Sequence, residues 1–316
     1  MMSHVYQDRF ETIRQLGEGG MGKVFLARDR HLARDVVIKV MHDRIVADAN
    51  FRERFQRETL LTAQFTHPYA VTVYDAYPND PQGPFILMEY IKGEPLDVVL
   101  ARCKRMEPRR VARLLRMLCD VLQAAHSKNL IHRDLKPSNL MIVDPDTPYE
   151  ILKVMDFGLA KLLQSTDGSR MTQHDFAVGT PGYMCPEQAR GEEMDNRGDI
   201  YSVGVILYEL LTGNVPFKGQ NTMEVLVAHA VEEPPSFSSQ GAVGVVPPAI
   251  ENVVKACLAK NPDDRPQSAR ELFERFEAAL SQSESAATSP MAPGKAARTT
   301  SSLPPVKPVA PAKPGA

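Results

Sequence analysis

Three polar side chains in the middle of the chain lie at offsets that suit the transfer of a phosphoryl group to a hydroxyl. Residues 132 to 139 read HRDLKPSN, and residues 156 to 158 read DFG. They supply Asp134, a carboxylate able to orient a hydroxyl and accept its proton, and two oxygen ligands for a hard cation, Asn139 and Asp156. Taken singly, each of the three could instead cap a turn or end a strand. Together, at these offsets, they predict a phosphotransfer site.

A glycine-rich segment near the N-terminus has the pattern of a phosphate-binding turn. Gly17, Gly19 and Gly22 fit GxGxxG, which also occurs in dinucleotide-binding turns and in ordinary loops. In a dinucleotide-binding turn the glycines open a helix, whereas residues 23 to 26 read KVFL and continue as a strand. The sequence therefore favours a glycine hairpin whose backbone N–H groups lie over phosphate oxygens.

A lysine occupies the strand-like run that follows the glycines. Residues 36 to 40 read VVIKV, and Lys39 stands seventeen residues after Gly22. A charge inside an apolar strand needs a partner or a route to water, so Lys39 could be a strand-edge lysine that reaches solvent. Its spacing from the glycines favours the other interpretation, a ligand of nucleotide phosphates.

These motifs, in this order, resemble the eukaryotic-like serine/threonine protein kinases of bacterial type, from residue 10 to residue 279. The resemblance implies that Asp134 is the catalytic base and that Lys136 neutralises the transferred phosphate. It implies ATP as the phosphate donor. It also implies that Asn139 and Asp156 hold Mg²⁺, with Mn²⁺ as an alternative.

The resemblance also implies an ion pair between Lys39 and Glu58, in the helical stretch near residues 49 to 66. Glu53 competes for that role, and the distance of Glu58 from the following His-Pro pair favours Glu58. One turn later Thr62 stands where an apolar residue is expected, which predicts looser packing of this helix.

The adenine pocket is expected between Met88, in the gatekeeper position, and the hinge that follows it. Backbone groups of the hinge residues Glu89 and Ile91 can pair with the purine edge, although the same residues could simply end a strand. The full set of residues expected around ATP is Leu16, Gly17, Gly19, Gly22, Val24, Lys39, Met88, Glu89, Ile91, Asn139 and Asp156.

Several residues are expected to support the site. By resemblance, Glu187 pairs with Arg265, and Asp199 begins the family's Asp-x-Trp-Ser-x-Gly pattern. The resemblance also implies that Thr180 contacts both Asp134 and Lys136. Two departures from the family accompany them. A cysteine at 185 replaces the alanine of Ala-Pro-Glu, as a small buried side chain or as a redox switch, and a tyrosine at 201 replaces the tryptophan.

The resemblance predicts phosphorylation of serine and threonine in protein substrates. Lys136 and the proline after it separate this class from tyrosine kinases, whose loops usually carry Ala-Ala-Arg or Arg-Ala-Ala. The segment between Asp156 and Glu187 is expected to be switched by autophosphorylation at Thr172, in a stretch similar to the Thr-Gln-Thr motif of bacterial relatives. Arg133, directly before the base, can bind the new phosphate, and self-association would let one copy modify another.

Apolar periodicity predicts an α+β fold with two lobes, the protein-kinase fold that the resemblance implies. Residues 10 to 89 carry β-type runs around one helical stretch, which predicts a small antiparallel sheet with one main helix. Residues 90 to 279 carry long helical patterns, at 109 to 128, 199 to 212, 223 to 232 and 269 to 280. Residues 281 to 316, rich in Pro, Ala and Ser, predict a disordered tail.

Composition excludes little beyond this. The 316 residues carry a formal net charge of −2, which gives no electrostatic reason to expect nucleic acid. The four cysteines show no zinc or disulfide spacing, and no apolar run reaches the length of a membrane span, so a cytoplasmic protein without a membrane segment is expected.

Two other function classes remain to be weighed against the kinase. Small-molecule phosphotransferases share the lobed fold, but they generally lack the GTPGY segment at residues 179 to 183 and the signature that begins at Asp199. A non-catalytic binding module predicts the loss of Lys39, Asp134, Asn139 or Asp156, and all four are present.

Overall fold

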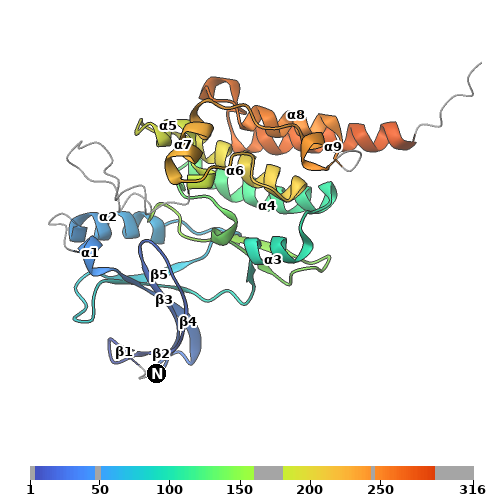
Figure 1. The fold of residues 1–316 in the computed structure, drawn as a ribbon. Helices are drawn as coiled ribbons and strands as arrows, with labels where there is room; N and C mark the ends of the chain where they lie inside the picture. The colour runs from blue at the N-terminus through green and yellow to red at the C-terminus, as the bar shows by residue number, and fades with distance from the viewer. Residues whose placement is uncertain (1–3, 47–50, 160–180, 243–245, 289–316) are drawn as a thin grey trace, which may run out of the picture.

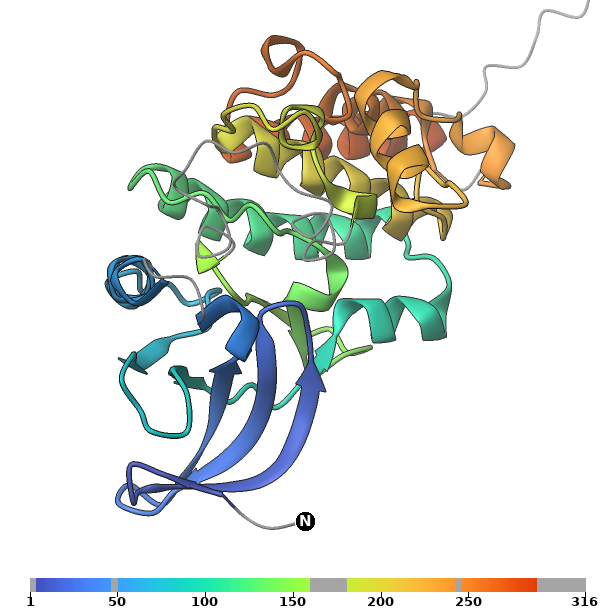
Figure 2. The same ribbon diagram turned by 60° about the vertical axis from the view of Figure 1, so that its left-hand side comes forward.

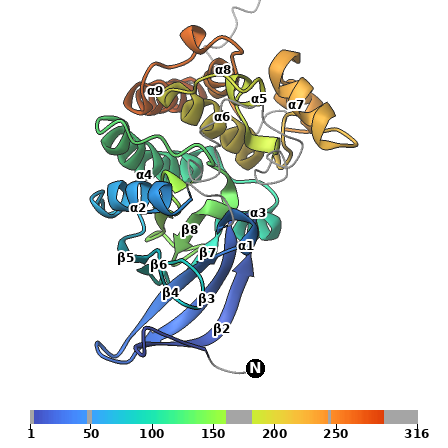
Figure 3. The ribbon, with the colours of Figure 1, turned by 90° about the vertical axis from the view of Figure 1, so that its left-hand side faces the viewer.

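The chain folds into a strand-rich N-terminal lobe and a mainly helical C-terminal lobe, which confirms the expected α+β class (Figure 1). The computed structural model describes residues 4–46, 51–159, 181–242 and 246–288. Viewed from the side, the twisted sheet lies below and the stacked helices above, with the strands β7 to β9 at the junction (Figure 3).

The N-terminal lobe is built on a six-stranded antiparallel sheet in the order β1-β2-β3-β4-β6-β5. Its Val- and Ile-rich central strand is buried on both faces, as such composition favours. The strands are β1 (Val5–Tyr6), β2 (Phe10–Glu18), β3 (Gly22–Asp29), β4 (Arg34–Met41), β5 (Val73–Tyr77) and β6 (Phe85–Glu89).

Each face of this sheet carries its own apolar cluster. On one face Phe51 and Phe55 of helix α2 (Phe51–Ala63) pack with Val37, Ile86 and Met88. The short helix α1 (Asp43–Val46) precedes α2. The opposite face is covered by aromatic side chains of the first strands and of β6. The main helix is thus held by burial of its phenylalanines, because its own sequence is rich in charge.

The C-terminal lobe begins with a second, three-stranded sheet in the order β7-β8-β9. These strands are β7 (Glu94–Pro95), β8 (Leu140–Val143) and β9 (Ile151–Val154). The helices are α3 (Leu96–Cys103), α4 (Pro108–His126), α5 (Pro186–Ala189), α6 (Asn196–Thr212), α7 (Thr222–Val231), α8 (Pro248–Cys257) and α9 (Ala269–Thr288). Short 3₁₀ turns cover Pro137–Asn139, Pro181–Tyr183, Phe237–Gln240 and Pro262–Asp264.

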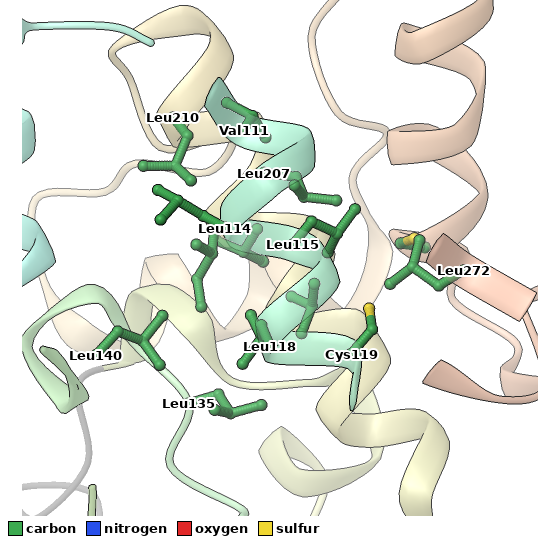
Figure 4. Close-up of a cluster of buried hydrophobic side chains, with 14 of the residues drawn as sticks. Val111, Leu114, Leu115, Leu118, Cys119, Leu135, Leu140, Leu207, Leu210 and Leu272 are labelled. Carbon is green, nitrogen blue, oxygen red and sulfur yellow. The ribbon is translucent and has the colours of Figure 1, made fainter. Parts of the chain in front are cut away.

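Helices α4 and α6 form the centre of this lobe. Figure 4 shows Leu115 of α4 beside Leu207 of α6, Leu118 towards Leu135, and Cys119 towards Leu272 of α9, all within one buried cluster. Helix α6 is apolar on nearly every side and almost wholly buried, so it serves as the core on which the other helices pack (Figure 2). Its first turn carries Asp199, whose role is described below.

Element boundaries agree with the sequence patterns except at the C-terminus. Helix α9 continues to Thr288, so the predicted tail boundary at residue 281 is wrong for residues 281 to 288. These residues read SQSESAAT, with no proline or glycine to stop the helix, and proline first returns at position 290. The rest of the predicted tail lies outside the described residues. Within the described part of the chain, no helix is long and apolar enough to cross a membrane.

Candidate active site

The catalytic loop brings Asp134, Lys136 and Asn139 into direct contact. Lys136 Nζ lies 2.9 Å from Asp134 Oδ2, and Asn139 Nδ2 donates to the Asp134 carbonyl at 2.7 Å and to Oδ2 at 3.1 Å. Because the amide nitrogen of Asn139 is used in this way, its oxygen is the atom left for a cation. The Asp134 side chain is 23% exposed, so a substrate hydroxyl can reach it.

Asp199 holds the backbone that precedes Asp134. Its two carboxylate oxygens accept the backbone N–H groups of His132 and Arg133, both at 2.9 Å. His126 Nε2 lies 2.8 Å from the same carboxylate. Burial raises the pKa of the Asp199 carboxyl, but the hydrogen bonds and the nearby histidines together lower that pKa by more. The carboxylate therefore stays ionised. A charged anchor at the start of α6 therefore fixes the catalytic loop.

The loop is also tied to the segment that carries Asp156. His132 Nε2 donates to the Met155 carbonyl at 2.7 Å, and its Nδ1 accepts the backbone N–H of Asp134 at 3.3 Å. Arg133 and Asp156 both adopt left-handed backbone conformations, with φ of 69° and 59°. Such values are strained for residues other than glycine, and they cluster at functional sites.

Lys39 pairs with Asp156 in this structure, and the expected pair with Glu58 is a correction. Lys39 Nζ lies 2.7 Å from Asp156 Oδ2, and the side chains are 8% and 21% exposed. Burial raises the pKa of Asp156, but the charges of Lys39, His132 and Lys136 and the hydrogen bond from Lys39 together lower it by more. Glu58 is buried on α2 with its carboxylate 3.0 Å from Arg57 Nε. Between the described residues Lys39 and Glu58 no ion pair forms, because Lys39 is neutralised by the carboxylate that follows β9.

Thr62, one turn after Glu58, is buried as expected for its place on the helix, but its hydroxyl has a specific partner. Its Oγ1 lies 2.9 Å from the Glu58 carbonyl and 3.1 Å from the Phe157 carbonyl. Because position 62 holds threonine where an apolar residue was expected, α2 gains a polar contact to the segment that carries Asp156.

The glycine hairpin forms between β2 and β3 as expected. The backbone N–H of Gly19 donates to the Gly22 carbonyl at 3.0 Å and closes the turn. A Cβ at Gly22 would lie 1.9 Å from the Val40 carbonyl oxygen, so only glycine fits there. His42, which sequence reasoning missed, has its Nε2 3.0 Å from the Gly19 carbonyl and steadies the hairpin. Leu16 and Val24 lie on the two strands of the hairpin.

The hinge lies at the end of β6. Met88 is buried there, Glu89 is the last residue of the strand, and Ile91 follows as a buried residue. The Glu89 carboxylate accepts Lys153 Nζ of β9 at 2.8 and 3.1 Å and the backbone N–H of Thr72 at 3.2 Å. This contact joins the hinge to the sheet that leads into Asp156. It was not predicted.

Glu187 and Arg265 form the expected ion pair deep in the C-terminal lobe. Two parallel contacts of 2.8 and 2.9 Å join the guanidinium to the carboxylate, and the side chains are 0% and 5% exposed for Arg265 and Glu187. Burial raises the pKa of Glu187, but Arg265 and the other hydrogen bonds to the carboxylate together lower it by more. Cys185 beside them is fully buried, and burial raises the pKa of its thiol, which favours the packing interpretation.

Tyr201, at the position of the family tryptophan, uses its hydroxyl inside the protein. Its oxygen lies 2.9 Å from Nδ1 of His229 on α7, which is completely buried. Lys260 donates to the His229 carbonyl at 2.9 Å and lies over the ring of Phe217, 4.2 Å from its centroid. Burial and Lys260 lower the pKa of His229 to about 4, so it is neutral at physiological pH.

Two predicted residues, Thr172 and Thr180, lie outside the described residues. The other predicted residues lie in two places. Most lie between the two lobes, and the pair of Glu187 and Arg265 lies inside the C-terminal lobe. The missed contacts, those of His42, Lys153 and His229, involve single residues without a local motif. In sequence they stand 23, 64 and 28 residues from their partners, so no local spacing could have revealed them.

The two lobes, the glycine hairpin and the fixed catalytic loop together define a protein kinase domain. A family model described as "Protein kinase domain" matches residues 10–276, so the chain belongs to this family. Members of the family use ATP with a divalent metal ion. The match begins at residue 10, where the domain was expected to begin, and ends three residues before the expected end at residue 279.

Curated bacterial relatives are similar over most of this chain. The chain is 41% identical over 276 residues to serine/threonine-protein kinase pkn3 of Myxococcus xanthus, covering 87% of this chain and 49% of the relative. It is 42% identical over 269 residues to serine/threonine-protein kinase PknB of Mycolicibacterium smegmatis, covering 84% and 42%. The chain thus spans half or less of the length of these relatives. The predicted membership among bacterial eukaryotic-like serine/threonine kinases is confirmed.

Solved structures resemble the fold. The kinase domain of PknI from Mycobacterium tuberculosis has a TM-score of 0.69 and 24% sequence identity, over 89% of this chain and 99% of that one. At this identity the likeness supports the fold alone.

Proposed function

We propose that this chain is a serine/threonine protein kinase that transfers the γ-phosphate of ATP to protein hydroxyls. The observation that carries the proposal is the Asp134 carboxylate, partly exposed and bonded to both Lys136 and Asn139. In the transfer, the substrate oxygen bonds to the γ-phosphorus, the bond from that phosphorus to the ADP oxygen breaks, and Asp134 accepts the hydroxyl proton. Lys136 offsets the charge of the transferred group.

The nucleotide would lie between the glycine hairpin and the hinge, with Lys39 at its phosphates. Asn139 and Asp156 offer hard oxygen donors, which suit Mg²⁺ and also Mn²⁺. The metal would neutralise phosphate charge when bound. The described residues contain no group of three or more His, Cys, Asp and Glu placed to hold a metal ion, which fits a cation held largely by phosphate and water. Lys39 and Asp156 would have to separate when nucleotide and metal bind.

The choice of serine and threonine rests on Lys136, followed by proline, and on the names of the curated relatives. We expect activation by autophosphorylation at Thr172, between two copies that associate transiently. Protein substrates, and not nucleic acid, are expected as partners, since the net charge is only −2. A cytoplasmic location is proposed because the reaction needs ATP and because all four cysteines are free thiols.

The test is transfer of labelled phosphate from Mg-ATP to the protein itself and to a mixed protein substrate. Lys39→Met and Asp156→Asn are expected to lower transfer at least about a hundredfold, since each removes a group at the phosphates. Lys218→Met, at an exposed lysine bonded only to Asn214 among the described residues, is the matched control and should be fully active. Transfer by the wild type no greater than by the two site variants would favour a non-catalytic binding module.

The class of acceptor is a separate question with its own measurement. Phosphoamino-acid analysis of the labelled product should give phosphoserine and phosphothreonine. A product that is mostly phosphotyrosine would refute the assignment of acceptor while leaving phosphotransfer itself established.

A further inference from the structure

Thr62 makes a hydrogen bond that crosses from the main N-lobe helix to the segment that carries Asp156. Its residue is 5% exposed, so water does not compete for the hydroxyl. Oγ1 lies within bonding distance of two carbonyl oxygens, those of Glu58 at 2.9 Å and Phe157 at 3.1 Å. A hydroxyl has a single proton, so the two carbonyls share one donor.

The Glu58 carbonyl is the ordinary acceptor, because buried threonines in helices commonly bond four residues back. Thr59, three residues earlier on the same helix, shows that pattern alone. Its hydroxyl contacts the carbonyls of Phe55 and Gln56, both within α2. The contact to Phe157 is therefore an addition specific to Thr62, and Thr59 is an internal reference for it.

The acceptor at Phe157 is held firmly on its other sides. Its ring packs edge-on against Phe65, with centroids 5.2 Å apart, and against His132, at 4.9 Å. The next residue, Gly158, is so close that a Cβ there would lie 3.6 Å from Thr62 Oγ1. The hydroxyl thus bonds a rigid backbone atom directly after Asp156. In Figure 3, α2 lies between the strands and the C-lobe helices, where such a bond links the two lobes.

We propose that Thr62 is a positioning residue that ties α2 to Phe157 and so favours the arrangement in which Lys39 pairs with Asp156. The inference rests on the proposed kinase function. Among the described residues, the carboxylate at bonding distance from Lys39 is that of Asp156. Glu58 lies one turn before Thr62 on α2, and its carbonyl is the other acceptor of the Thr62 hydroxyl. Glu58 and Thr62 lie one turn apart on the same helix, so a movement of α2 that brought Glu58 to Lys39 would also displace Thr62 relative to Phe157. The tie therefore restrains the exchange of Lys39 from Asp156 to Glu58.

The decisive variant is Thr62→Val, which keeps the shape of the side chain and removes the proton donor. Hydrogen exchange of the α2 amides in the nucleotide-free protein should accelerate about fivefold, the effect of one net hydrogen bond. Basal phosphotransfer of the dephosphorylated protein should rise by a similar factor. Thr62→Ser should restore both values towards wild type, since it keeps the hydroxyl.

Thr59→Val is the matched control, because it removes a buried threonine hydroxyl whose described partners all lie within α2. It should leave basal phosphotransfer unchanged. The proposal is overturned if Thr62→Val matches wild type in both measurements, if it lowers basal transfer, or if Thr59→Val changes both as much. Hydrogen exchange needs no catalysis, so a wild type that transfers no phosphate would sink the proposed function while the tie is still tested.

Discussion

Two ion pairs of the site differ in how they are held. Glu187 and Arg265 meet through two parallel bonds inside the C-terminal lobe, and Arg265 also donates to the carbonyls of Ala259, Arg197 and Lys260. Lys39 and Asp156 meet through a single contact, with Asp156 21% exposed. The first pair has every donor satisfied by fixed groups, whereas the second has room to exchange partners.

The two pairs also lie in different parts of the molecule. We call the C-lobe region around Glu187, Arg265 and Asp199 the platform. The base, its loop and the Asp199 anchor all stand on the lobe that contains the buried pair. Lys39 and Glu58 stand on the other lobe, where in this structure each has a different partner from the one expected. We therefore propose that phosphotransfer is controlled by the positions of the N-lobe groups relative to Asp134, the proposed base, which the C-terminal lobe already holds in place.

Breaking the buried pair should have the largest effect on stability. Arg265→Met leaves Glu187 charged and without its partner in the core, which should lower the free energy of unfolding by about 3–5 kcal/mol. Urea denaturation measures it. Lys39→Met should lower the free energy of unfolding much less, because water can reach Asp156, although the same variant is expected to lose phosphotransfer.

A neighbouring arginine supplies the control for this comparison. Arg197 pairs with Asp195 and Asp263 near the surface, where the carboxylates are 48% and 77% exposed. Arg197→Met should therefore lower the free energy of unfolding by less than about 1 kcal/mol. Equal losses for the two arginine variants would show that burial does not distinguish the pairs.

The buried His229 should have an intermediate effect on the free energy of unfolding, and this effect should depend on pH. The pKa of His229 is lowered to about 4 by burial and by Lys260, against 6.5 in an unfolded chain. Between these values the unfolded chain binds the extra proton, so stability is lost as pH falls below 6.5 and the loss levels off below about 4. The slope approaches about 1.4 kcal/mol per pH unit.

His229→Asn should remove that part of the pH dependence while retaining a polar partner for Tyr201. Urea denaturation of wild type and variant should be measured at pH 7, 6 and 5. As pH falls, the wild type should lose more stability than the variant, so the difference between their free energies of unfolding should narrow or reverse. His31→Asn, at an exposed histidine, should leave the pH profile of the wild type unchanged. A constant difference between wild type and His229→Asn across this range would contradict the lowered pKa.

The sequence predicts contacts within one short segment well and contacts between distant segments poorly. Asp134, Lys136 and Asn139 lie within one short loop, so their spacing alone places them together, and the glycine hairpin is equally local. The partner of Lys39 depends on where α2 sits against the sheet, which is a tertiary property. The spacing of the family pattern suggested Glu58, whereas in the structure Lys39 pairs with Asp156 and Glu58 contacts Arg57.

Composition also misled at one place. The stretch from residue 281 to residue 288 is polar and small, which resembles the tail that follows, yet it lacks helix breakers and continues α9. Helix propagation needs only compatible residues once a buried helix precedes them. The Glu89 and Lys153 contact was missed for a different reason, since 64 residues separate the partners.

The contact between Lys153 and Glu89 should have the smallest effect. It joins both carboxylate oxygens, like the buried pair, but it is only partly buried. Its side chains are 20% exposed for Lys153 and 25% for Glu89. A double-mutant cycle of Lys153→Met and Glu89→Gln should give a coupling free energy of about 0.5–1 kcal/mol, falling at high salt. If the coupling instead approaches the loss seen for Arg265→Met, bidentate geometry would outweigh burial. The hinge would then belong with the rigid platform, and movement of the N-lobe would have to come from α2 alone.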